Sequence, residues 1–491
     1  MAEPAALGAP IDTDDPNTIP DYVEFLQRDA LAVPDLFFER GDEISTPTHK
    51  VDTAHYISGE FFDREATGLW SRVWQVACRE NDIPEVGDFV EYQIVDRSVI
   101  IVRDAPDSIS AFHNACRHRG TAVASGCGHA TEFNCPFHSW RYHLDGSLKH
   151  VPCRWDFPEV TDAEYGLLPV RAETWDGWVF VNLDPDAEPL RDFLGDVVPR
   201  HFEQFPRSEM WKAWHLGMVV DCNWKATVEA FMETYHIART HPTLVAHSSD
   251  VFTQYDTFGL HARLLQPNGV PCQQPGVEYT PAEIVASMVN LSTPQGDGDE
   301  QENDGGYVST ARFGAGARTS DAAEIAADAD VRQLVAARRR EAARESGIDM
   351  SDACDAEVLD SIEYFVFPNF FPWGGRSGGL AYRMRPWGPN PETMLFEILL
   401  LVPLPGGTPR PQDSPLRILA PGETFDDMRD QMAQLFLLDQ DMSNLPRVQR
   451  GMHSLDHVMF ADRQERNIIA FHQNLEGFLD GSPRRGGTDG R

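Results

Sequence analysis

Two short motifs in the first third of the chain each combine a thiol with an imidazole. Cys116 and His118 form a Cys-x-His motif, and Cys135 and His138 form a Cys-x-x-His motif further along. Structural zinc sites usually group cysteine with cysteine and histidine with histidine. One kind of [2Fe–2S] cluster instead needs two thiolates on one iron and two imidazoles on the other. Because each motif offers one ligand of each type, the pattern predicts a cluster of this kind.

The residues around these motifs agree with loops that wrap closely around a cluster. Gly120 follows the first motif and Pro136 lies inside the second, and both types suit a backbone in a tight turn. The patterns Cys-x-His-Arg-Gly and Cys-Pro-x-His-x-Trp resemble the paired loops of Rieske proteins at all four ligand positions. The resemblance implies that the two cysteines and two histidines bind a Rieske [2Fe–2S] cluster. The alternative is a Cys2His2 zinc site or two unrelated hairpins.

A second pair of histidines lies in the segment 223–242, where apolar spacing predicts a helix. Glu233 and His236 would be neighbours on one face of that helix. His241 would lie about 140° round from His236, so the imidazoles converge only if the helix loosens or ends between them. Pro242 gives a reason for an end, because the residue before a proline avoids the α conformation. Two imidazoles and one carboxylate from elsewhere would form a face for mononuclear Fe(II).

The two regions together resemble the α-subunit of Rieske non-haem iron oxygenases, the aromatic-ring-hydroxylating dioxygenase family, over most of the chain. The resemblance implies that His236 and His241 bind catalytic iron. It also implies a terminal oxygenase that uses O2 and externally supplied electrons to hydroxylate an aromatic substrate, with dihydroxylation favoured. A Rieske monooxygenase or demethylase acting on a methyl, an ether or a quaternary amine is the alternative. A redox or zinc-binding protein without oxygenase activity is the third hypothesis.

The third iron ligand of this family is an aspartate about eight residues before a Gln in a Gln-Arg-Gly run. Asp441 stands eight residues before Gln449, so the resemblance indicates Asp441. Asp439 competes with it, because Asp439 continues the apolar stripe of a helix predicted over 423–444. Periodicity alone does not decide between the two acids.

Three residues before the first iron histidine, the family usually carries an aspartate that connects the cluster of one subunit to the iron of its neighbour. This chain has Glu233 there, which keeps an acceptor for a histidine ligand. A glutamate at this place also occurs in the branch of the family that oxidises quaternary amines, so the substrate class stays open. The resemblance implies a head-to-tail homotrimer, with or without a β-subunit.

The chain has no motif with which it could take electrons from a nucleotide by itself. It shows neither a dinucleotide-binding glycine loop nor a Cys-x4-Cys-x2-Cys cluster motif. We therefore expect a ferredoxin, a flavin reductase or both as the electron donor. Five basic residues near the cluster motifs could dock an acidic donor or could simply be solvated: Arg117, Arg119, Arg141, Lys149 and Arg154.

The elements that must position these groups predict an α+β protein of two domains. Short strand patterns separated by turns over 51–190 predict an antiparallel β domain that carries the cluster loops. Helices and a long buried strand over 191–475 predict a catalytic domain with a curved antiparallel sheet wrapped around helices. Residues 1–50 indicate an N-terminal arm, and the composition of 476–491 indicates a disordered tail.

Two further patterns fall inside the catalytic domain. Residues 270–310 are rich in Pro, Gln, Gly and Asp, and the run QGDGDEQENDGG within them predicts a solvated loop. An Ala- and Arg-rich helix is predicted over 321–345, stopped by Gly347.

Composition limits the partners and the compartment. The chain has 491 residues, more than one core usually supports, and a formal charge of −36, so nucleic acid and anionic membrane are not expected as partners. Its eight cysteines show no disulfide pattern. No signal peptide opens the chain, and no apolar run reaches the ~18 residues that span a bilayer. We therefore expect a soluble, cytoplasmic protein.

Overall fold

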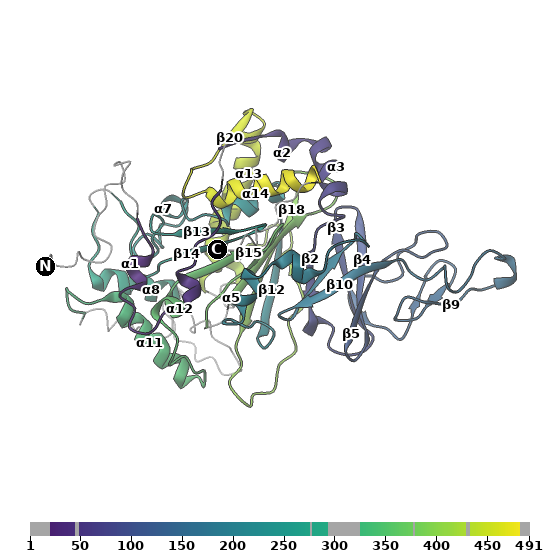
Figure 1. Cartoon of the computed structure of the whole chain (residues 1–491), viewed down its shortest axis with the longest axis horizontal. Helices are drawn as coiled ribbons and strands as arrows, with labels where there is room; N and C mark the ends of the chain where they lie inside the picture. Colours follow the sequence, from purple (N-terminus) through teal and green to yellow (C-terminus); the bar gives the residue numbers. More distant parts are fainter. Residues whose placement is uncertain are drawn as a thin grey trace.

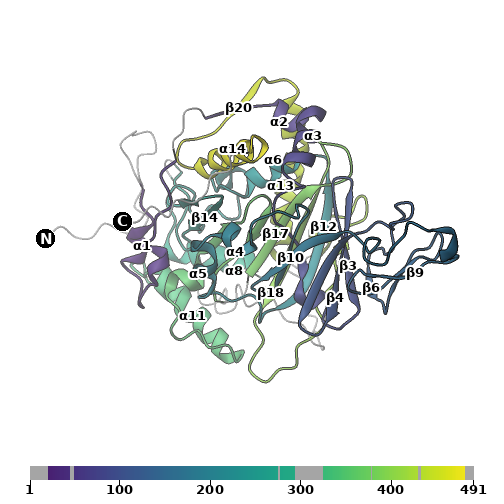
Figure 2. The same cartoon turned by 45° about the vertical axis from the view of Figure 1, so that its right-hand side comes forward.

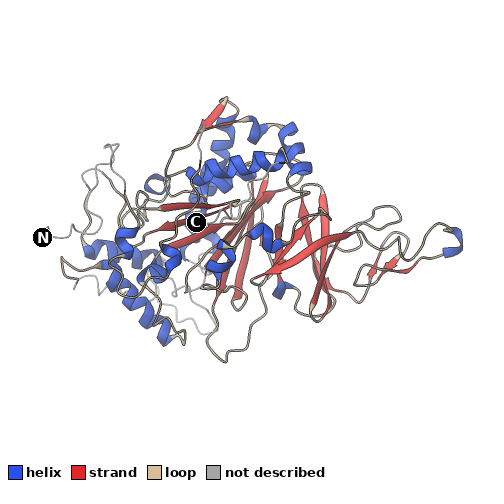
Figure 3. Ribbon diagram, in the orientation of Figure 1, coloured by secondary structure: helices blue, strands red, loops and turns tan. Residues whose placement is uncertain are grey.

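Strands dominate one end of the molecule, and helices gather around further sheets at the other end (Figures 1 and 3). The computed structural model describes residues 20–44, 49–274, 277–292, 325–376, 379–428 and 433–481. Within these residues, all pairings between named strands but one are antiparallel. The predicted α+β class, with an antiparallel β region followed by a region of mixed helices and sheets, is confirmed.

The N-terminal region is built on a seven-stranded sheet in the order β2-β11-β10-β5-β4-β3-β6. Both faces of this sheet are covered, as β4 shows. Val99 and Ile101 join the main core of the protein, whereas Ile100 and Val102 join a small separate core on the opposite face, as the two-residue period of a strand requires. The strands are β2 (Gln75–Arg79), β3 (Asp88–Ile94), β4 (Arg97–Ala105), β5 (Ser108–His113), β6 (Cys127–His129), β10 (Pro169–Trp175) and β11 (Trp178–Asn182).

The small separate core lies under a three-stranded sheet made of β7 (Phe133–Asn134), β8 (Arg141–Tyr142) and β9 (Leu148–His150). The first cluster motif lies in the connection from β5 to β6, and the second lies between β7 and β8. In both views the segment around β9 projects from the end of the molecule away from α8 and α11 (Figures 1 and 2). The loops that carry the predicted cluster ligands therefore form part of an outlying lobe.

The C-terminal region is organised around a five-stranded sheet in the order β16-β17-β18-β12-β19, beside a three-stranded sheet β13-β14-β15. All nine residues of the central strand β18 are buried, which confirms the long buried strand expected from the sequence. The strands are β12 (Trp211–Val220), β13 (Gln254–Phe258), β14 (His261–Gln266), β15 (Ser361–Phe365), β16 (Phe370–Pro372), β17 (Gly379–Pro386), β18 (Met394–Val402) and β19 (Arg417–Ile418).

Two groups of helices surround these sheets (Figure 2). The first group packs together above the central sheet and consists of α2 (Ala54–Ile57), α3 (Gly59–Gly68), α6 (Trp224–Ala230), α13 (Phe436–Met452) and α14 (Arg466–Leu479). The second group has its own apolar core and consists of α8 (Pro281–Ser292), α11 (Val331–Glu345) and α12 (Asp355–Leu359). Shorter elements connect them: α1 (Val23–Leu26), α4 (Leu190–Leu194), α5 (Val197–Phe202), α7 (Ile237–Thr240), β1 (Lys50–Asp52), β20 (His457–Met459) and the 3-10 turns Asp35–Phe37, Glu80–Asp82, Arg154–Asp156, Asp426–Met428 and Ala433–Leu435.

Two expectations about C-terminal helices were wrong in part. The helix predicted over 423–444 is instead α13, which begins at Phe436 and continues to Met452 through Pro446. The solvated loop predicted for the run QGDGDEQENDGG lies outside the described residues; before it, within 270–310, the structure has α8, whose apolar face packs on α11. The helix predicted over 321–345 begins at Val331, capped by the side chain of Asp330.

A buried ionic network joins the two regions. Glu397 on β18 accepts from Arg383 at 2.6 Å and 3.1 Å, from Arg385 at 3.0 Å and is paired with His215 at 3.0 Å. Arg383 also donates to the carbonyl oxygens of Val76 and Ala77 in β2, both at 2.7 Å. Arg385 donates to a carbonyl oxygen of β3. These arginines therefore fix the N-terminal sheet to the central sheet of the C-terminal region.

The two ends of the chain are partly described. Residues 1–19 and 45–48 lie outside the described residues, and in the described part of the N-terminal arm Tyr22 is buried and donates to Asp360 at 2.7 Å, which agrees with an arm that packs on the body of the protein. At the other end, α14 ends at Leu479, so the first residues of the segment 476–491 are helical; residues 482–491 are not described. Within the described residues, no helix has the length and apolar character needed to cross a bilayer.

Candidate metal centres

Each predicted cluster motif lies in a turn closed by backbone hydrogen bonds to its cysteine. In the first loop the Cys116 amide donates to the Thr121 carbonyl oxygen at 2.8 Å, and the Gly120 amide donates back to Cys116 at 2.8 Å. In the second, the Cys135 amide donates to Trp140 at 2.8 Å and the Ser139 amide donates to Cys135 at 3.0 Å. Both turns need a residue with positive φ. Gly120 has φ +80°, which glycine adopts without steric penalty, and Ser139 has φ +57°, which is uncommon for a residue with a Cβ atom.

The two loops bring their imidazoles together. The rings of His118 and His138 are 4.6 Å apart, and His118 stacks on Trp140 with an angle of 5° between the ring planes. Cys116 and Cys135 are 3% and 2% exposed. The Nδ1 atom of His118 is buried without a hydrogen-bond partner. A buried ring nitrogen in this state is costly, and coordination of a metal would satisfy it, so the residues present fit the expected cluster.

The arrangement of the four side chains also bears on the zinc alternative. Among the described residues, one group of three His, Cys, Asp or Glu side chains has all its ligand atoms within 4.8 Å of one another, and that group lies elsewhere in the molecule. The ligand atoms of the four loop residues are thus not gathered this closely. Ligands of one tetrahedral zinc, each about 2.0–2.3 Å from the ion, would lie within about 4 Å of one another. The four loop residues therefore fit two metal atoms better than a single zinc ion.

Tyr142 is a neighbour of the cluster motifs that the sequence interpretation missed. Its hydroxyl accepts from the Arg117 amide at 3.0 Å and lies 3.3 Å from the Cys116 sulfur, to which it would donate when that sulfur is a thiolate. Burial raises the pKa of the Cys116 thiol, and the Tyr142 hydrogen bond opposes that rise. The sequence did contain an indication of this contact. Tyr142 lies two residues after Trp140, and side chains at this spacing in an extended chain point to the same side.

The outer side of the cluster loops is open to solvent. His138 is exposed, and Phe137 beside it is 56% exposed. Of the basic residues near the loops, Arg141 and Lys149 both pair with Glu132, and Arg154 pairs with Asp162. Part of the basic group is thus neutralised within the chain, but Arg119 is exposed with its guanidinium 5.3 Å from the centre of the Phe137 ring. The exposed tip therefore presents an imidazole, a phenyl ring and a cation.

The segment that carries the second histidine pair is not one continuous helix, and this part of the prediction was wrong. Helix α6 ends at Ala230, and the chain passes through turns before the short helix α7 begins after His236. Thr234 explains the break: its amide donates to the Tyr255 hydroxyl at 3.1 Å and its own hydroxyl bonds to Tyr255 at 2.8 Å. These tertiary bonds replace the helical ones. His241 follows α7 with φ −118° and ψ 69°, so the helical path also ends before Pro242.

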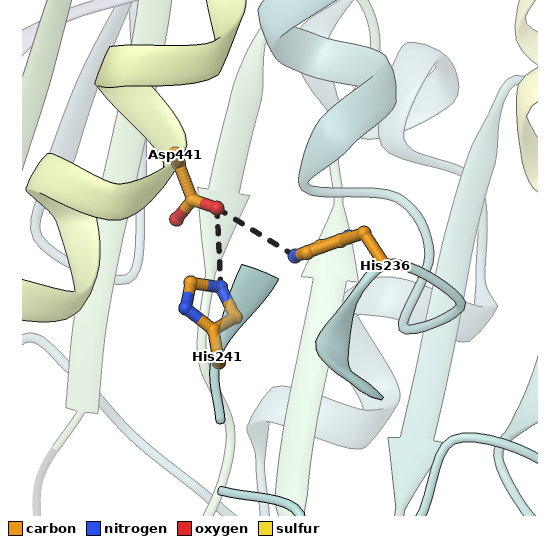
Figure 4. A group of neighbouring side chains, drawn as sticks. All are labelled: His236, His241 and Asp441. Atoms are coloured by element: carbon orange, nitrogen blue, oxygen red, sulfur yellow. Dashed lines mark ion pairs between the residues drawn. The ribbon is translucent and has the colours of Figure 1, made fainter. Parts of the chain in front are cut away.

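The two imidazoles converge on a carboxylate from α13 (Figure 4). Asp441 Oδ1 lies 3.1 Å from His241 Nε2 and 3.7 Å from His236 Nε2. These three residues are the group whose ligand atoms lie within 4.8 Å of one another. Asp439 points elsewhere and accepts from the amides of Phe425 and Asp426 at 2.9 Å and 2.7 Å. The structure thus brings Asp441, and not Asp439, beside the histidines.

Two neighbours set the orientation of the imidazoles. Glu233 accepts from His236 Nδ1 at 2.6 Å and from the His236 amide at 3.1 Å. Gln440, which the sequence interpretation missed, lies with Oε1 2.7 Å from His241 Nδ1. When both Nδ1 atoms donate, both Nε2 atoms present lone pairs toward Asp441. Burial lowers the pKa of His236, but the charge and hydrogen bond of Glu233 outweigh it and raise that pKa to about 9. The site therefore favours a positive charge at Nε2, which a metal cation would supply.

A cavity of about 260 Å³ lies next to this group. Leu437 and Leu438 on α13 line it one turn before Asp441, and Leu244 lines it three residues after His241. Tyr382 also lines it and lies close enough for the charge of Asp441 to contribute, after burial and Glu363, to a raised tyrosine pKa. His236, His241 and Asp441 do not line the cavity themselves, but these neighbours place it within about one helical turn of Asp441 along α13.

One loop pair suited to a two-metal cluster and one group of two histidines and a carboxylate are typical of an oxygenase with two iron centres. Comparison with family models agrees: residues 73–161 match the Rieske [2Fe-2S] domain, and residues 201–481 match the ring hydroxylating alpha subunit (catalytic domain). The second match covers more than half of the chain. The chain belongs to the ring-hydroxylating alpha subunit family, whose two domains bind a [2Fe–2S] cluster and mononuclear iron, and the predicted cofactors are confirmed at that level.

Similar proteins include oxygenase subunits with different substrates. The carnitine monooxygenase oxygenase subunit of Escherichia coli K12 is 30% identical over 189 residues, which is 38% of this chain and 50% of that protein. The 2-aminobenzenesulfonate 2,3-dioxygenase subunit alpha of an Alcaligenes species is 32% identical over 193 residues, 38% of this chain and 49% of that protein. The chain spans about half the length of the curated relatives it matches.

Likeness in fold extends further. The crystal structure of a quaternary ammonium Rieske monooxygenase that oxidises carnitine aligns with 89% of this chain and 100% of its own, with a TM-score of 0.60 and 16% identity. The fold is thus shared over nearly the whole chain, while the low identity leaves the chemistry of the cavity to be argued from its own residues.

Proposed function

We propose that this chain is the terminal oxygenase component of a multicomponent system, which uses O2 and externally supplied electrons to hydroxylate an aromatic substrate. The observation that carries the proposal is the group formed by His236, His241 and Asp441, which lies near a cavity of about 260 Å³ in a chain that also matches the Rieske domain. Three ligands on one face leave positions for O2 and substrate. The proposal places the cluster in a domain over 51–190 and the iron in a domain over 191–475.

The proposal gives each of these residues a role. Cys116 and Cys135 would bind one iron of the cluster and the histidines of the same loops would bind the other, while His236, His241 and Asp441 would bind the mononuclear iron, a role supported by their convergence. When bound, the cluster supplies one electron at a time and the mononuclear iron supplies the activation of O2. Glu233 and Gln440 fix the imidazole rings through their Nδ1 atoms, so the Nε2 lone pairs stay directed at one point.

Electron supply requires other molecules. The lobe with the cluster loops lies at the opposite end of the molecule from α8 and α11 (Figure 1), and the cavity beside the candidate iron site is lined by residues of α8 and α11. His138 is exposed on that lobe.

These features support a head-to-tail homotrimer in which the cluster lobe of one protomer meets Glu233 of its neighbour. A ferredoxin, a flavin reductase or both would reduce the cluster. The trimer would consist of this chain alone or would also include a β-subunit. The eight cysteines, all of them in the described residues, are free thiols, which supports a reducing compartment such as the cytoplasm.

The lining of the cavity favours an aromatic substrate over a quaternary amine. Its apolar side chains are mainly aliphatic, with Trp373 and Tyr382 as the two aromatic residues in the lining. A quaternary ammonium group is bound best by several aromatic faces around the cation, and a cationic arginine also lines the cavity. Glu233 and the similarity to carnitine monooxygenase keep a Rieske monooxygenase of quaternary amines as the second candidate.

Oxygen consumption tests the proposal directly. Protein loaded with both cofactors and reduced by a ferredoxin and its reductase is mixed with aromatic acids, polycyclic arenes and quaternary amines, and O2 uptake is compared with product formed. The expected result is O2 uptake coupled to a dihydroxylated aromatic product. Coupled uptake with a quaternary amine alone would favour the second candidate. Absence of iron from active protein would overturn both.

A further inference from the structure

One cationic side chain lines the cavity beside the candidate iron site: Arg339, in the middle of α11. Its Nη1 atom donates to the Val358 carbonyl oxygen at 3.0 Å. Within the described residues, no carboxylate forms an ion pair with its guanidinium. Its Nε and Nη2 atoms have no bonded acceptor and are not among the enclosed unpaired atoms, so they are open to the space that the side chain lines.

Three other arginines of the same helix, Arg332, Arg340 and Arg344, pair with carboxylates. Arg338 has no ion pair among the described residues, but it does not line the cavity, so Arg339 is distinct within the cavity wall. Arg332 forms a bidentate pair with Asp360 at 2.6 Å and 3.0 Å, and Arg340 pairs with Asp355 at 2.6 Å. Asp360 accepts a further bond from Tyr22 at 2.7 Å. Asp355 and Asp360 are the aspartates nearest in sequence to Val358, which Arg339 contacts. Both therefore already accept hydrogen bonds from other side chains.

The remaining acid of the cavity wall is also satisfied. Glu357 accepts from the Gln204 side chain at 2.8 Å and from the Cys354 amide at 2.9 Å, where it caps α12. The one imidazole of the lining, that of His247, is kept neutral, because burial and the charge of Arg339 lower its pKa to about 3. Arg339 stays charged, since burial lowers its pKa only to about 10. The wall thus presents a single cation with free donors in a fork.

The rest of the cavity is suited to a carbon skeleton. Toward α13 it is lined by Leu437, Leu438 and Leu435, and from the central sheet by Leu380 and Ile398. A guanidinium with two free donor atoms matches the geometry of a carboxylate or sulfonate. An organic anion whose acidic group pairs with Arg339 would place its apolar part against these side chains, on the side of the histidines and Asp441.

We propose that the substrate of this cavity is an organic acid whose carboxylate or sulfonate is bound by Arg339. This inference rests on the proposed function for the identity of the cavity as a substrate site. Arg339 acts as a specificity-determining residue: it fixes one end of the substrate on α11 and so determines which carbon atoms lie beside the iron ligands.

Binding without turnover tests the proposal. Calorimetry on metal-loaded protein compares benzoate, 2-naphthoate and hexanoate with their neutral amides. We expect at least one acid to bind about tenfold more tightly than its amide, since charge-assisted hydrogen bonds are involved. In the Arg339→Met variant the Kd of that acid should rise about ten- to hundredfold while the Kd of the amide is unchanged, and Arg339→Lys should recover part of the loss.

The matched control is Arg344→Met on the same helix, because Arg344 is exposed and pairs with Glu341 away from the cavity. It should leave every Kd unchanged. If all three acids bind no better than their amides, or if the preference for an acid survives in Arg339→Met, the proposal is overturned; the wild-type comparison decides even if a variant fails to fold. Acid binding through Arg339 without O2 consumption would contradict the proposed function alone. Turnover of neutral arenes that Arg339→Met does not alter would contradict this inference alone.

Discussion

The two candidate metal centres are built in opposite ways. The proposed cluster ligands come from two loops within a short stretch of the chain, and one of them, His138, is exposed. The proposed iron ligands come from α13 and from the segment around α7, some two hundred residues apart, and His241 and Asp441 are only 5% and 9% exposed. A centre that receives electrons must be reached by another protein, whereas a centre that activates O2 must limit access of water. The difference in burial matches this difference in task.

The largest expected effect comes from removing a cluster thiolate. Replacing Cys116 by Ala should abolish the visible absorption of the cluster and reduce steady-state O2 consumption to background, because one iron loses half of its protein ligands. The protein should still bind mononuclear iron, since the two centres share no ligand. The matched control is Cys127→Ala, which removes an exposed free thiol from the nearby strand β6. A variant at Cys116 that keeps its spectrum would contradict the assignment.

Substitutions of the two aspartates of α13 should have different effects, one on metal binding and the other on stability. Replacing Asp441 by Ala should lower the mononuclear iron content at least about tenfold, measured by elemental analysis corrected for the cluster. Replacing Asp439 by Asn should keep that iron but lower the free energy of unfolding by about 1–3 kcal/mol, because one of two backbone amides loses a charged acceptor. The reverse pattern would exchange the roles of the two residues.

The connection between the centres should depend on the charge of one side chain. Replacing Glu233 by Gln should leave both metals bound and slow single-turnover oxidation about 10- to 100-fold, as is typical when a hydrogen-bonded partner of a metal ligand is changed. Stopped-flow oxidation of the reduced cluster in the presence of substrate measures this rate. The Glu233→Asp variant, which keeps a carboxylate, should recover part of the rate. Unchanged oxidation in Glu233→Gln would remove this residue from the path.

A smaller effect is expected at the hydrogen bond to the cluster sulfur. Replacing Tyr142 by Phe should lower the reduction potential by about 40 mV, since a hydrogen bond of about 1 kcal/mol to the thiolate stabilises the reduced form. Redox titration followed by absorption measures it. Tyr165→Phe is the control, because Tyr165 lies over the Arg117 guanidinium and has no hydrogen bond to a sulfur among the described contacts. Equal potentials for Tyr142→Phe and wild type would contradict the role of this bond.

The same contrast explains what could be predicted from the sequence. The cluster motifs are local, so their residue types and spacing indicated the two loops and their ligands directly. The iron group is not local, and Asp441 was chosen over Asp439 only through the family pattern. In the structure the two acids differ because Asp439 is occupied by the amides of Phe425 and Asp426, residues that periodicity along α13 cannot reveal.

The errors in the predicted helices have the same origin. A helix over 223–242 agreed with apolar spacing, yet Thr234 bonds to Tyr255 across the fold and the helix ends at Ala230. The cavity likewise combines side chains from α8, α11, α12, α13 and two sheets. No pattern within one segment specifies such an assembly, so Arg339 appeared in the sequence only as part of an Ala- and Arg-rich helix.

The network around Glu397 has a consequence for electron tunnelling. Because Arg383 and Arg385 each bind this carboxylate and also backbone carbonyl oxygens of β2 and β3, the N-terminal sheet is tied to the central sheet through several buried charged bonds. In the proposed trimer, this junction would help to keep constant the distance that an electron tunnels between protomers.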